Sequence, residues 1–285
     1  MCRLFGFRSV LQSGVHQSLI DADNAIIQQS DRHPDGWGVA YYKMGSPHVI
    51  KMEGKARDSK IFKRVSGVVS SYTVLAHIRK STIGDIGPLN THPFQYGPWV
   101  FAHNGNIKDF VKVRELFIKD IDEELRSFIL GNTDSEVLFY YLLSLIKKKS
   151  NLSEFGQDRK LTIEVLGDFV KGFQDKVGPL TESKGEYDQN YLTFILTDGK
   201  FLLGFQGGQR LRYSTHKTKC PERDICSFFN PICEASSKED QKIHHLLLSS
   251  EEIKNENVWS EMNFGSYVGV TAEMNFFSGQ IEIPK

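Results

Sequence analysis

Residues 1–10 read MCRLFGFRSV, so that a cysteine at position two opens a largely apolar run. The run over 2–10 predicts a β-strand. Two interpretations fit Cys2. In the first it is an inert, small apolar residue at the start of an edge strand. In the second, removal of Met1 places a free α-amine beside the thiol, and an amine with an ordinary pKa of about 7.7–8.0 can take the proton of its own thiol.

The composition is that of an ordinary globular protein. The chain has 285 residues, of which 40% are hydrophobic and 25% charged, enough for one large core or two small ones. Lys and Arg total 35, as do Asp and Glu, so no net charge attracts nucleic acid or an anionic membrane. The apolar runs are too short to span a bilayer, and the N-terminus lacks the pattern of a secretory signal. We therefore expect a cytoplasmic protein with reduced thiols and neither nucleic acid nor membrane as partner.

The order of the predicted elements indicates an α+β protein. Strands are expected over 2–10, 36–43, 48–53, 73–79 and 99–105, and helices over 18–29, 109–118, 134–149 and 162–174. Two hairpins follow, over 190–205 with an Asp198-Gly199 turn and over 267–283 with a Ser278-Gly279 turn, and 246–250 is a buried strand between them. We also expect Ser18 to cap the first helix and a turn at Gly45-Ser46-Pro47. Strands, then helices, then strands favour a layered α+β domain over a parallel βαβ arrangement. We predict one domain over 2–285.

Five stretches carry polar residues where a predicted strand ends, the usual place for chemistry on a rigid scaffold. They are MC (1–2), RHPDGWG (32–38), AHIRKST (76–82), NTHPF with AHNGN (90–94 and 102–106), and NTDSE (132–136). Arg79 suits bidentate binding of a carboxylate, although a surface ion pair also explains it. Asp134 heads a helix that Thr133 can cap, a role compatible with binding an ammonium group.

Asn104-Gly105 ends the strand predicted over 99–105, and this dipeptide predicts a sharp turn. The Asn104 amide and the Gly105 N–H could together stabilise an oxyanion. The alternative is a type I′ hairpin turn, but no matching strand resumes after two residues.

The histidines and late cysteines do not have the spacing of a known zinc site. His77, His92 and His103 are interpreted as residues of the site wall. His216, Cys220, Cys226 and Cys233 lie in a polar loop over 214–242 with wider spacing than structural zinc sites have. A non-enzymatic zinc or interaction module built on these three cysteines is the alternative function.

Taken in order, MCRLFGF, PDGWG, HIR, NTHPF, HNGNI and TDSE resemble the class II glutamine amidotransferases of the N-terminal nucleophile hydrolase superfamily, above all their short stand-alone members. The motifs cover residues 2–136. The resemblance implies a four-layer αββα sandwich of two antiparallel sheets, with helices outside both sheets.

The resemblance also implies roles for single residues. Cys2 corresponds to the nucleophile, and its freed amine to the base. Asn104 and Gly105 correspond to the oxyanion hole. Arg79 resembles the clamp on the substrate α-carboxylate, and Asp134 the partner of the α-ammonium. The remaining matches, His92 and Thr82, are positions that line the glutamine pocket.

The implied activity is cysteine-dependent hydrolysis of a γ-glutamyl amide through a γ-glutamyl thioester, with no metal or organic cofactor. The substrate is glutamine, with ammonia passed to a synthase or peptidase partner, or a γ-glutamyl conjugate such as glutathione. Lys80 stands where many glutamine-dependent synthases have tryptophan, and Ile83 where histidine is common. These departures count against a lid and channel of the synthase type.

Overall fold

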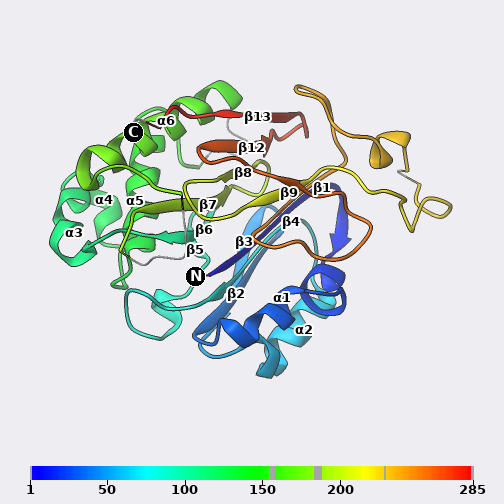
Figure 1. Ribbon diagram of the computed structural model, residues 1–285, viewed down its shortest axis with the longest axis horizontal. Helices are drawn as coiled ribbons and strands as arrows, with labels where there is room; N and C mark the ends of the chain where they lie inside the picture. The colour runs from blue at the N-terminus through cyan, green and yellow to red at the C-terminus, as the bar shows by residue number, and fades with distance from the viewer. Residues whose placement is uncertain (1, 154–157, 183–187, 228, 284–285) are drawn as a thin grey trace.

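The computed structural model describes residues 2–153, 158–182, 188–227 and 229–283. Two antiparallel sheets face each other, with helices outside both (Figure 1). The first sheet has the strand order β11-β9-β10-β1-β4-β2-β3, and the second has the order β13-β12-β8-β7-β6-β5. The predicted αββα sandwich is confirmed.

The bounds of the elements follow the predicted order. The first sheet comprises β1 (Arg3–Gly14), β2 (Gly36–Lys43), β3 (Ser46–Met52), β4 (Ser70–Arg79), β9 (Arg212–Ser214), β10 (His245–Ser249) and β11 (Ser260–Glu261). The second comprises β5 (Phe94–Tyr96), β6 (Trp99–Asn106), β7 (Tyr191–Thr197), β8 (Leu202–Phe205), β12 (Ser266–Val270) and β13 (Phe276–Gln280). The helices are α1 (Ile26–Gln29), α2 (Lys60–Val68), α3 (Phe110–Ile118), α4 (Glu123–Arg126), α5 (Asp134–Lys147) and α6 (Arg159–Val177).

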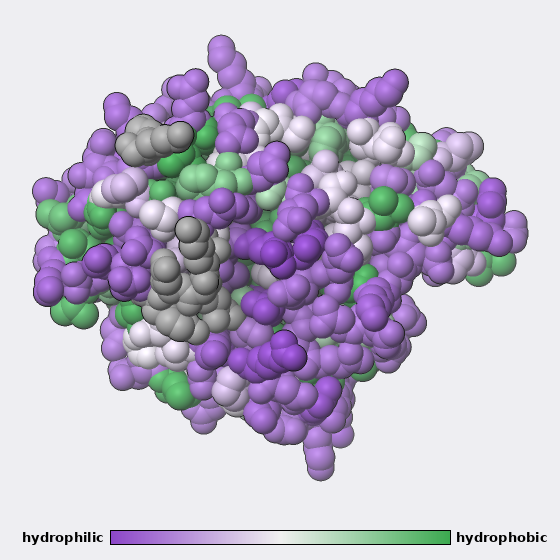
Figure 2. All heavy atoms as spheres, in the orientation of Figure 1, coloured by the Kyte–Doolittle hydropathy of each residue, from purple (hydrophilic) through white to green (hydrophobic). Residues whose placement is uncertain are grey.

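Three clusters of buried apolar side chains separate the layers. One lies between the first sheet and α1 and α2, and includes Phe5 and Ile26. A second lies between the second sheet and α3, α5 and α6, and includes Phe101. The third, which includes Leu4 and Ala102, joins the inner faces of the two sheets. With the apolar side chains gathered inside, the face shown in Figure 2 is mostly hydrophilic and has only small, separate apolar groups.

The alternation of β1 orients its first residues. Leu4 belongs to the cluster between the sheets, whereas Phe5 belongs to the cluster under the helices. Side chains two positions apart share a face of a strand, so Cys2 is on the inner face with Leu4. Arg3 pairs with Ile78 of β4, which brings the beginning of β1 beside the end of β4. Cys2 and the residues that follow β4 therefore lie together at one end of the sandwich.

The predicted helix over 18–29 is wrong as a single element. A π-helical turn spans Gln17–Asp21, and α1 starts only at Ile26. Between them Asn24 has a positive φ of 61° and donates through Nδ2 to Glu252 O at 2.7 Å. Ser18 lies inside the first turn and does not cap it. A tertiary contact with the 252–254 segment thus divides the helix.

Three predicted turns also differ from the structure. The β2–β3 turn is Met44-Gly45, both with positive φ, while Ser46 already belongs to β3. The β7–β8 loop has four residues, because the Asp198 carboxylate accepts from two later backbone N–H groups. The second late hairpin turns over 271–275, and Ser278 pairs with Val268 inside β13.

Candidate active site

Several element ends meet at one end of the sandwich. They are the beginnings of β1, β2 and α5 and the ends of β4 and β6. Gly36 of β2 pairs with Arg79, the last residue of β4. β1 and β6 contact each other across the two sheets. Residues far apart in sequence thus reach one small region.

Cys2 lies against the backbone that follows β4. Its Sγ donates to Lys80 O and accepts from Lys80 N–H, both at 3.4 Å. Burial raises the pKa of the Cys2 thiol, while the Lys80 N–H and the Arg79 guanidinium act in the opposite direction. The Asp134 carboxylate also acts on this pKa and raises it. The charges of Arg79 and Asp134 therefore both act on the Cys2 thiol. Met1, whose removal the second interpretation of Cys2 requires, lies outside the described residues.

Arg79 is 3% exposed and holds the loop that follows it. One guanidinium nitrogen donates to Asp85 O at 2.9 Å, and the other to Ile83 O at 3.0 Å and to Ser81 Oγ at 3.2 Å. Burial lowers the pKa of Arg79, and the Cys2 thiolate and Asp35 oppose that shift. Arg79 therefore fixes the loop that follows β4 and places a positive charge near the Cys2 thiol.

Asp134 begins α5, and Thr133 caps this helix as predicted, since its Oγ1 accepts from Glu136 N–H at 3.3 Å. Asp134 is 4% exposed. One of its carboxylate oxygens accepts from Ile107 N–H at 3.0 Å, and the other from Ser135 N–H at 2.7 Å. These bonds fix the carboxylate next to the end of β6.

The predicted sharp turn at Asn104-Gly105 is wrong. Both residues continue β6, where Asn104 pairs with Thr193 and Gly105 with Leu192. Pairing with β7 has overridden the turn preference of the dipeptide. Asn104 shares its face of the strand with Ala102, which belongs to the cluster between the sheets. Its side chain is therefore on the same inner side as Cys2, and its buried Oδ1 has no hydrogen-bond partner among the described residues.

The backbone of Gly105 faces the uncovered edge of β6. Gly105 lies opposite Leu192 of β7. The Leu192 N–H donates to Gly207 O on the β8 side, so Gly105 and Leu192 form a pair without hydrogen bonds between them. The Gly105 N–H and C=O consequently point away from β7. β5 covers that edge only as far as Phe101. A Cβ on Gly105 would lie 2.0 Å from His103 Nε2, so a side chain cannot fit.

His92 is buried behind the site and does not line the pocket described below. Its ring lies 4.2 Å from the ring of His77 and 4.7 Å from that of Phe94, centroid to centroid. None of the four ring nitrogens of His77 and His92 has a hydrogen-bond partner among the described residues. Burial lowers the pKa of both histidines well below 6.5. This places two neutral imidazoles side by side in the wall.

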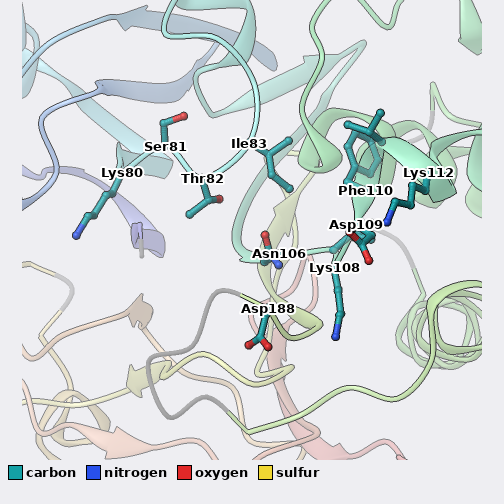
Figure 3. A pocket seen from close by; sticks show the side chains of 12 residues that line it. Lys80, Ser81, Thr82, Ile83, Asn106, Lys108, Asp109, Phe110, Lys112 and Asp188 are labelled. Carbon is teal, nitrogen blue, oxygen red and sulfur yellow. Dashed lines mark hydrogen bonds and ion pairs between the residues drawn. The ribbon is translucent and has the colours of Figure 1, made fainter.

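A pocket of about 660 Å³, called here the side pocket, is lined in part by Lys80 (Figure 3), whose backbone contacts Cys2 Sγ. Of the residues predicted for the site, only Thr82 lines it. The full lining is Lys80, Ser81, Thr82, Ile83, Asn106, Ile107, Lys108, Asp109, Phe110, Val111, Lys112 and Asp188. Ile83 accepts from Arg79 and Ile107 donates to Asp134, so the lining of the pocket includes direct neighbours of both charged residues.

Sequence reasoning missed three polar residues that shape the site. Asp35 accepts from Ser81 N–H through its carboxylate at 2.7 Å. Asn90 and Asn132 bond to each other and join the loop after Arg79 to the segment before Asp134. All three lie in the polar stretches named above: Asp35 in RHPDGWG, Asn90 in NTHPF and Asn132 in NTDSE. Their hydrogen bonds join residues distant in sequence, so the spacing of the motifs does not predict them.

The late cysteines are free thiols in a segment that projects from the side of the molecule (Figure 1). Cys233 Sγ lies 3.1 Å from His244 Nδ1. Within the described ranges, which include all three of these cysteines, no group of three or more His, Cys, Asp or Glu side chains could hold a metal ion. The zinc alternative therefore receives no support. No helix in the described part of the chain is both long and apolar enough to cross a membrane.

Comparison with known proteins points to one family. A family model described as glutamine amidotransferases class-II matches residues 1–275. The yeast (Saccharomyces cerevisiae) protein named "Probable glutamine amidotransferase DUG3" is 28% identical over 242 residues, covering 76% of this chain and 65% of that protein. The γ-glutamyl-hercynylcysteine sulfoxide hydrolase of Mycobacterium tuberculosis is 30% identical over 115 residues, covering 37% of this chain and 49% of that protein. The chain thus spans less than two thirds of the length of either relative.

A solved structure has the same fold along nearly the whole chain. It is a glutamine aminotransferase class-II domain protein from Silicibacter pomeroyi, with a TM-score of 0.60 and 18% sequence identity. The match covers 98% of this chain and 99% of that one.

Proposed function

The chain belongs to the class II glutamine amidotransferases, and we propose that it hydrolyses a γ-glutamyl amide with Cys2 as the nucleophile. The observation that carries the proposal is the position of the Cys2 thiol. It lies at the mouth of the sandwich, with Arg79 and Asp134 both acting on its pKa. A buried positive and a buried negative group beside one thiol suit an amino acid that carries its own carboxylate and ammonium.

The proposed reaction has two steps. Once Met1 is removed, the α-amine of Cys2 takes the thiol proton, and the thiolate attacks the γ-carbonyl carbon. The C–S bond forms, the C–N bond breaks, and the amine leaves with the proton. Water then attacks the thioester, so that a C–O bond replaces the C–S bond and glutamate and the thiol are released.

Asn104 and Gly105 are the proposed donors to the oxyanion of both steps. Two features support this role. Asn104 is on the inner face of β6 toward Cys2, and the Gly105 N–H points to an edge that no strand covers. Removing one such donor typically lowers kcat about 10²–10³-fold.

Arg79 is the proposed partner of the substrate α-carboxylate and Asp134 of its α-ammonium. Thr82, on the side pocket, is proposed to contact the substrate. His92 is proposed to support the wall of the substrate site indirectly, because its ring packs on the ring of His77.

Two substrate classes fit this site. One is glutamine, with ammonia passed to a synthase or peptidase partner. The other is a γ-glutamyl conjugate cleaved without a partner, and the name of the mycobacterial relative states hydrolysis of such a compound. Glutamate release by the purified protein from glutamine and from a γ-glutamyl thiol compares the two. A rate on the conjugate at least as high, with no partner present, rejects the subunit role.

Intact-mass measurement tests the nucleophile directly. We expect the purified protein to lack one methionine residue and to gain a single adduct from a glutamine-like electrophile. Cys2→Ala should abolish both the adduct and glutamate release with little change in Tm. Cys226→Ala is the matched control, since Cys226 is also a partly exposed free cysteine, and should keep both. Retention of Met1 in an active protein, or an adduct that survives Cys2→Ala, contradicts the proposal.

A further inference from the structure

The side pocket is larger than a glutamyl group needs. Its volume of about 660 Å³ falls in the range of pockets that hold drug-sized ligands. In the proposed function the substrate α-carboxylate and α-ammonium are already bound by Arg79 and Asp134. Only the amide nitrogen can then carry a further group. Ammonia, the leaving group of glutamine, would leave most of the pocket to solvent.

The side pocket has two opposite walls (Figure 3). Lys80 to Ile83 form one wall, and this wall begins at the residue whose backbone contacts Cys2 Sγ. The other wall is the segment from Asn106 to Lys112, which follows Gly105 directly and leads into α3. Both walls thus start next to the proposed reacting groups, Cys2 and Gly105, and lead away from them. A pocket that holds a substituent on the reacting amide must have this arrangement.

The charge of the side pocket is positive overall. Lys80, Lys108 and Lys112 line it against Asp109 and Asp188. Lys112 is paired with Asp109, Nζ to Oδ1, at 3.3 Å. Lys80 and Lys108 form no ion pair with any residue that the structure describes. The three lysines and two aspartates of the lining leave an excess of one positive charge, which favours a ligand with a negative charge.

We propose that the side pocket binds the amine portion of a γ-glutamyl amide, and that Lys80 and Lys108 select an amine that bears a carboxylate. The substrate class is then a γ-glutamyl amino acid or peptide. This inference rests on the proposed function. When the C–N bond breaks and the thioester forms, the amine in the pocket departs with the thiol proton as the first product.

Two substrates that differ only in the charge of the leaving amine test the inference. γ-Glutamylglycine carries a free carboxylate, and γ-glutamylglycinamide carries a neutral amide in its place. We expect kcat/KM of the wild-type protein to be about threefold to tenfold higher for γ-glutamylglycine, since one exposed ion pair contributes up to roughly a fivefold effect and both Lys80 and Lys108 line the side pocket. The preference should shrink at high salt because these charges are exposed.

Lys108→Glu is the diagnostic variant. Lys108 is exposed, and its structural contact is made by the backbone, whose N–H donates to Asn190 Oδ1 at 2.9 Å. We expect the ratio of the two kcat/KM values to fall to one or below. Lys63→Glu on α2 makes the same charge change at an exposed lysine outside the side pocket and should keep the wild-type ratio.

The outcomes separate the two levels of inference. If both dipeptides and glutamine are cleaved with a wild-type ratio near one, or if Lys108→Glu and Lys63→Glu behave alike, the selectivity of the side pocket is refuted while the hydrolase function stands. If the wild-type protein, shown by mass to lack Met1, releases glutamate from none of the three compounds, the proposed function itself fails.

Discussion

Asn90 and Asn132, 42 positions apart, exchange two hydrogen bonds. Asn90 Nδ2 donates to Asn132 Oδ1 at 2.7 Å, and Asn132 N–H donates back to Asn90 Oδ1 at 2.8 Å. Asn132 Nδ2 also donates to Asp85 Oδ2 at 2.9 Å. This pair joins the loop held by Arg79 to the start of the helix that carries Asp134. The Asn90–Asn132 pair therefore connects the segments that carry Arg79 and Asp134, the two residues proposed to bind the substrate.

Asn90→Asp should loosen this connection. The new carboxylate cannot donate to Asn132 Oδ1 or to Asp85 O, and Asn90 is only 6% exposed. We expect the free energy of unfolding to fall by about 1–3 kcal/mol and KM for a γ-glutamyl substrate to rise more than kcat falls. Urea unfolding and steady-state kinetics measure both. Asn255→Asp is the control, because the Asn255 side chain acts as an acceptor, which aspartate retains. An unchanged KM in Asn90→Asp would reject the positioning role.

Arg79→Lys should raise KM for the γ-glutamyl substrate by about tenfold to 100-fold, since lysine cannot offer the planar fork to a carboxylate. It should also free the loop, because one ammonium cannot replace bonds to Ser81, Ile83 and Asp85. Initial rates against substrate concentration give KM and kcat separately. Arg64→Lys, at an exposed position of α2, serves as control. Wild-type saturation in Arg79→Lys would count against the carboxylate clamp.

Gly105→Ala and Gly67→Ala should have opposite effects on stability. At Gly105 the added Cβ would lie 2.0 Å from His103 Nε2 and 2.3 Å from Tyr191 O, so β6 must shift. We expect a loss of about 3 kcal/mol or more, or failure to fold. At Gly67, within α2, nothing lies within 4 Å, and alanine should stabilise by about 0.5–1 kcal/mol. Thermal unfolding distinguishes them, and equal Tm values for the two variants would contradict the packing at Gly105.

The buried histidines predict loss of stability in acid. Burial lowers the pKa of His77 and His92 in the folded state, so below pH 6.5 the unfolded chain binds protons that the folded chain does not. The stabilising contribution is complete above pH 6.5 and is lost as pH falls below it. Each residue can contribute up to roughly 1.4 kcal/mol of loss between pH 7.5 and 5.5.

His77→Gln isolates this effect, because it removes one titrating group from the pair. Urea unfolding at pH 7.5 and 5.5 should show a smaller difference between the two pH values than in the wild-type protein, whatever the overall stability of the variant. His48→Gln, at an exposed position, makes the same exchange away from the site. If His77→Gln keeps the full wild-type difference, His77 does not titrate as described.

Much of the site could be predicted because its signals are local. The apolar run after Cys2 predicts a strand, Thr133 is placed to cap the helix that Asp134 begins, and the ordered motifs single out Arg79 and Asp134 through their resemblance to a family. The strand and the cap depend on neighbours within a few positions, and the motifs are recognised from their order along the chain, so the sequence alone carries them.

The rest depended on residues distant in sequence. Asn104-Gly105 would turn in isolation, but the edge of β7 holds it in a strand. The helix predicted over 18–29 is divided by a contact of Asn24 with Glu252. The sequence thus determined the α+β class, because periodicity and turn signals are short-range, while the αββα sandwich and the candidate residues came from the resemblance of its ordered motifs to a family. Only the tertiary structure decided where the Gly105 N–H points and which loop Arg79 holds, because hydrogen bonds and packing between distant segments outweigh local preference.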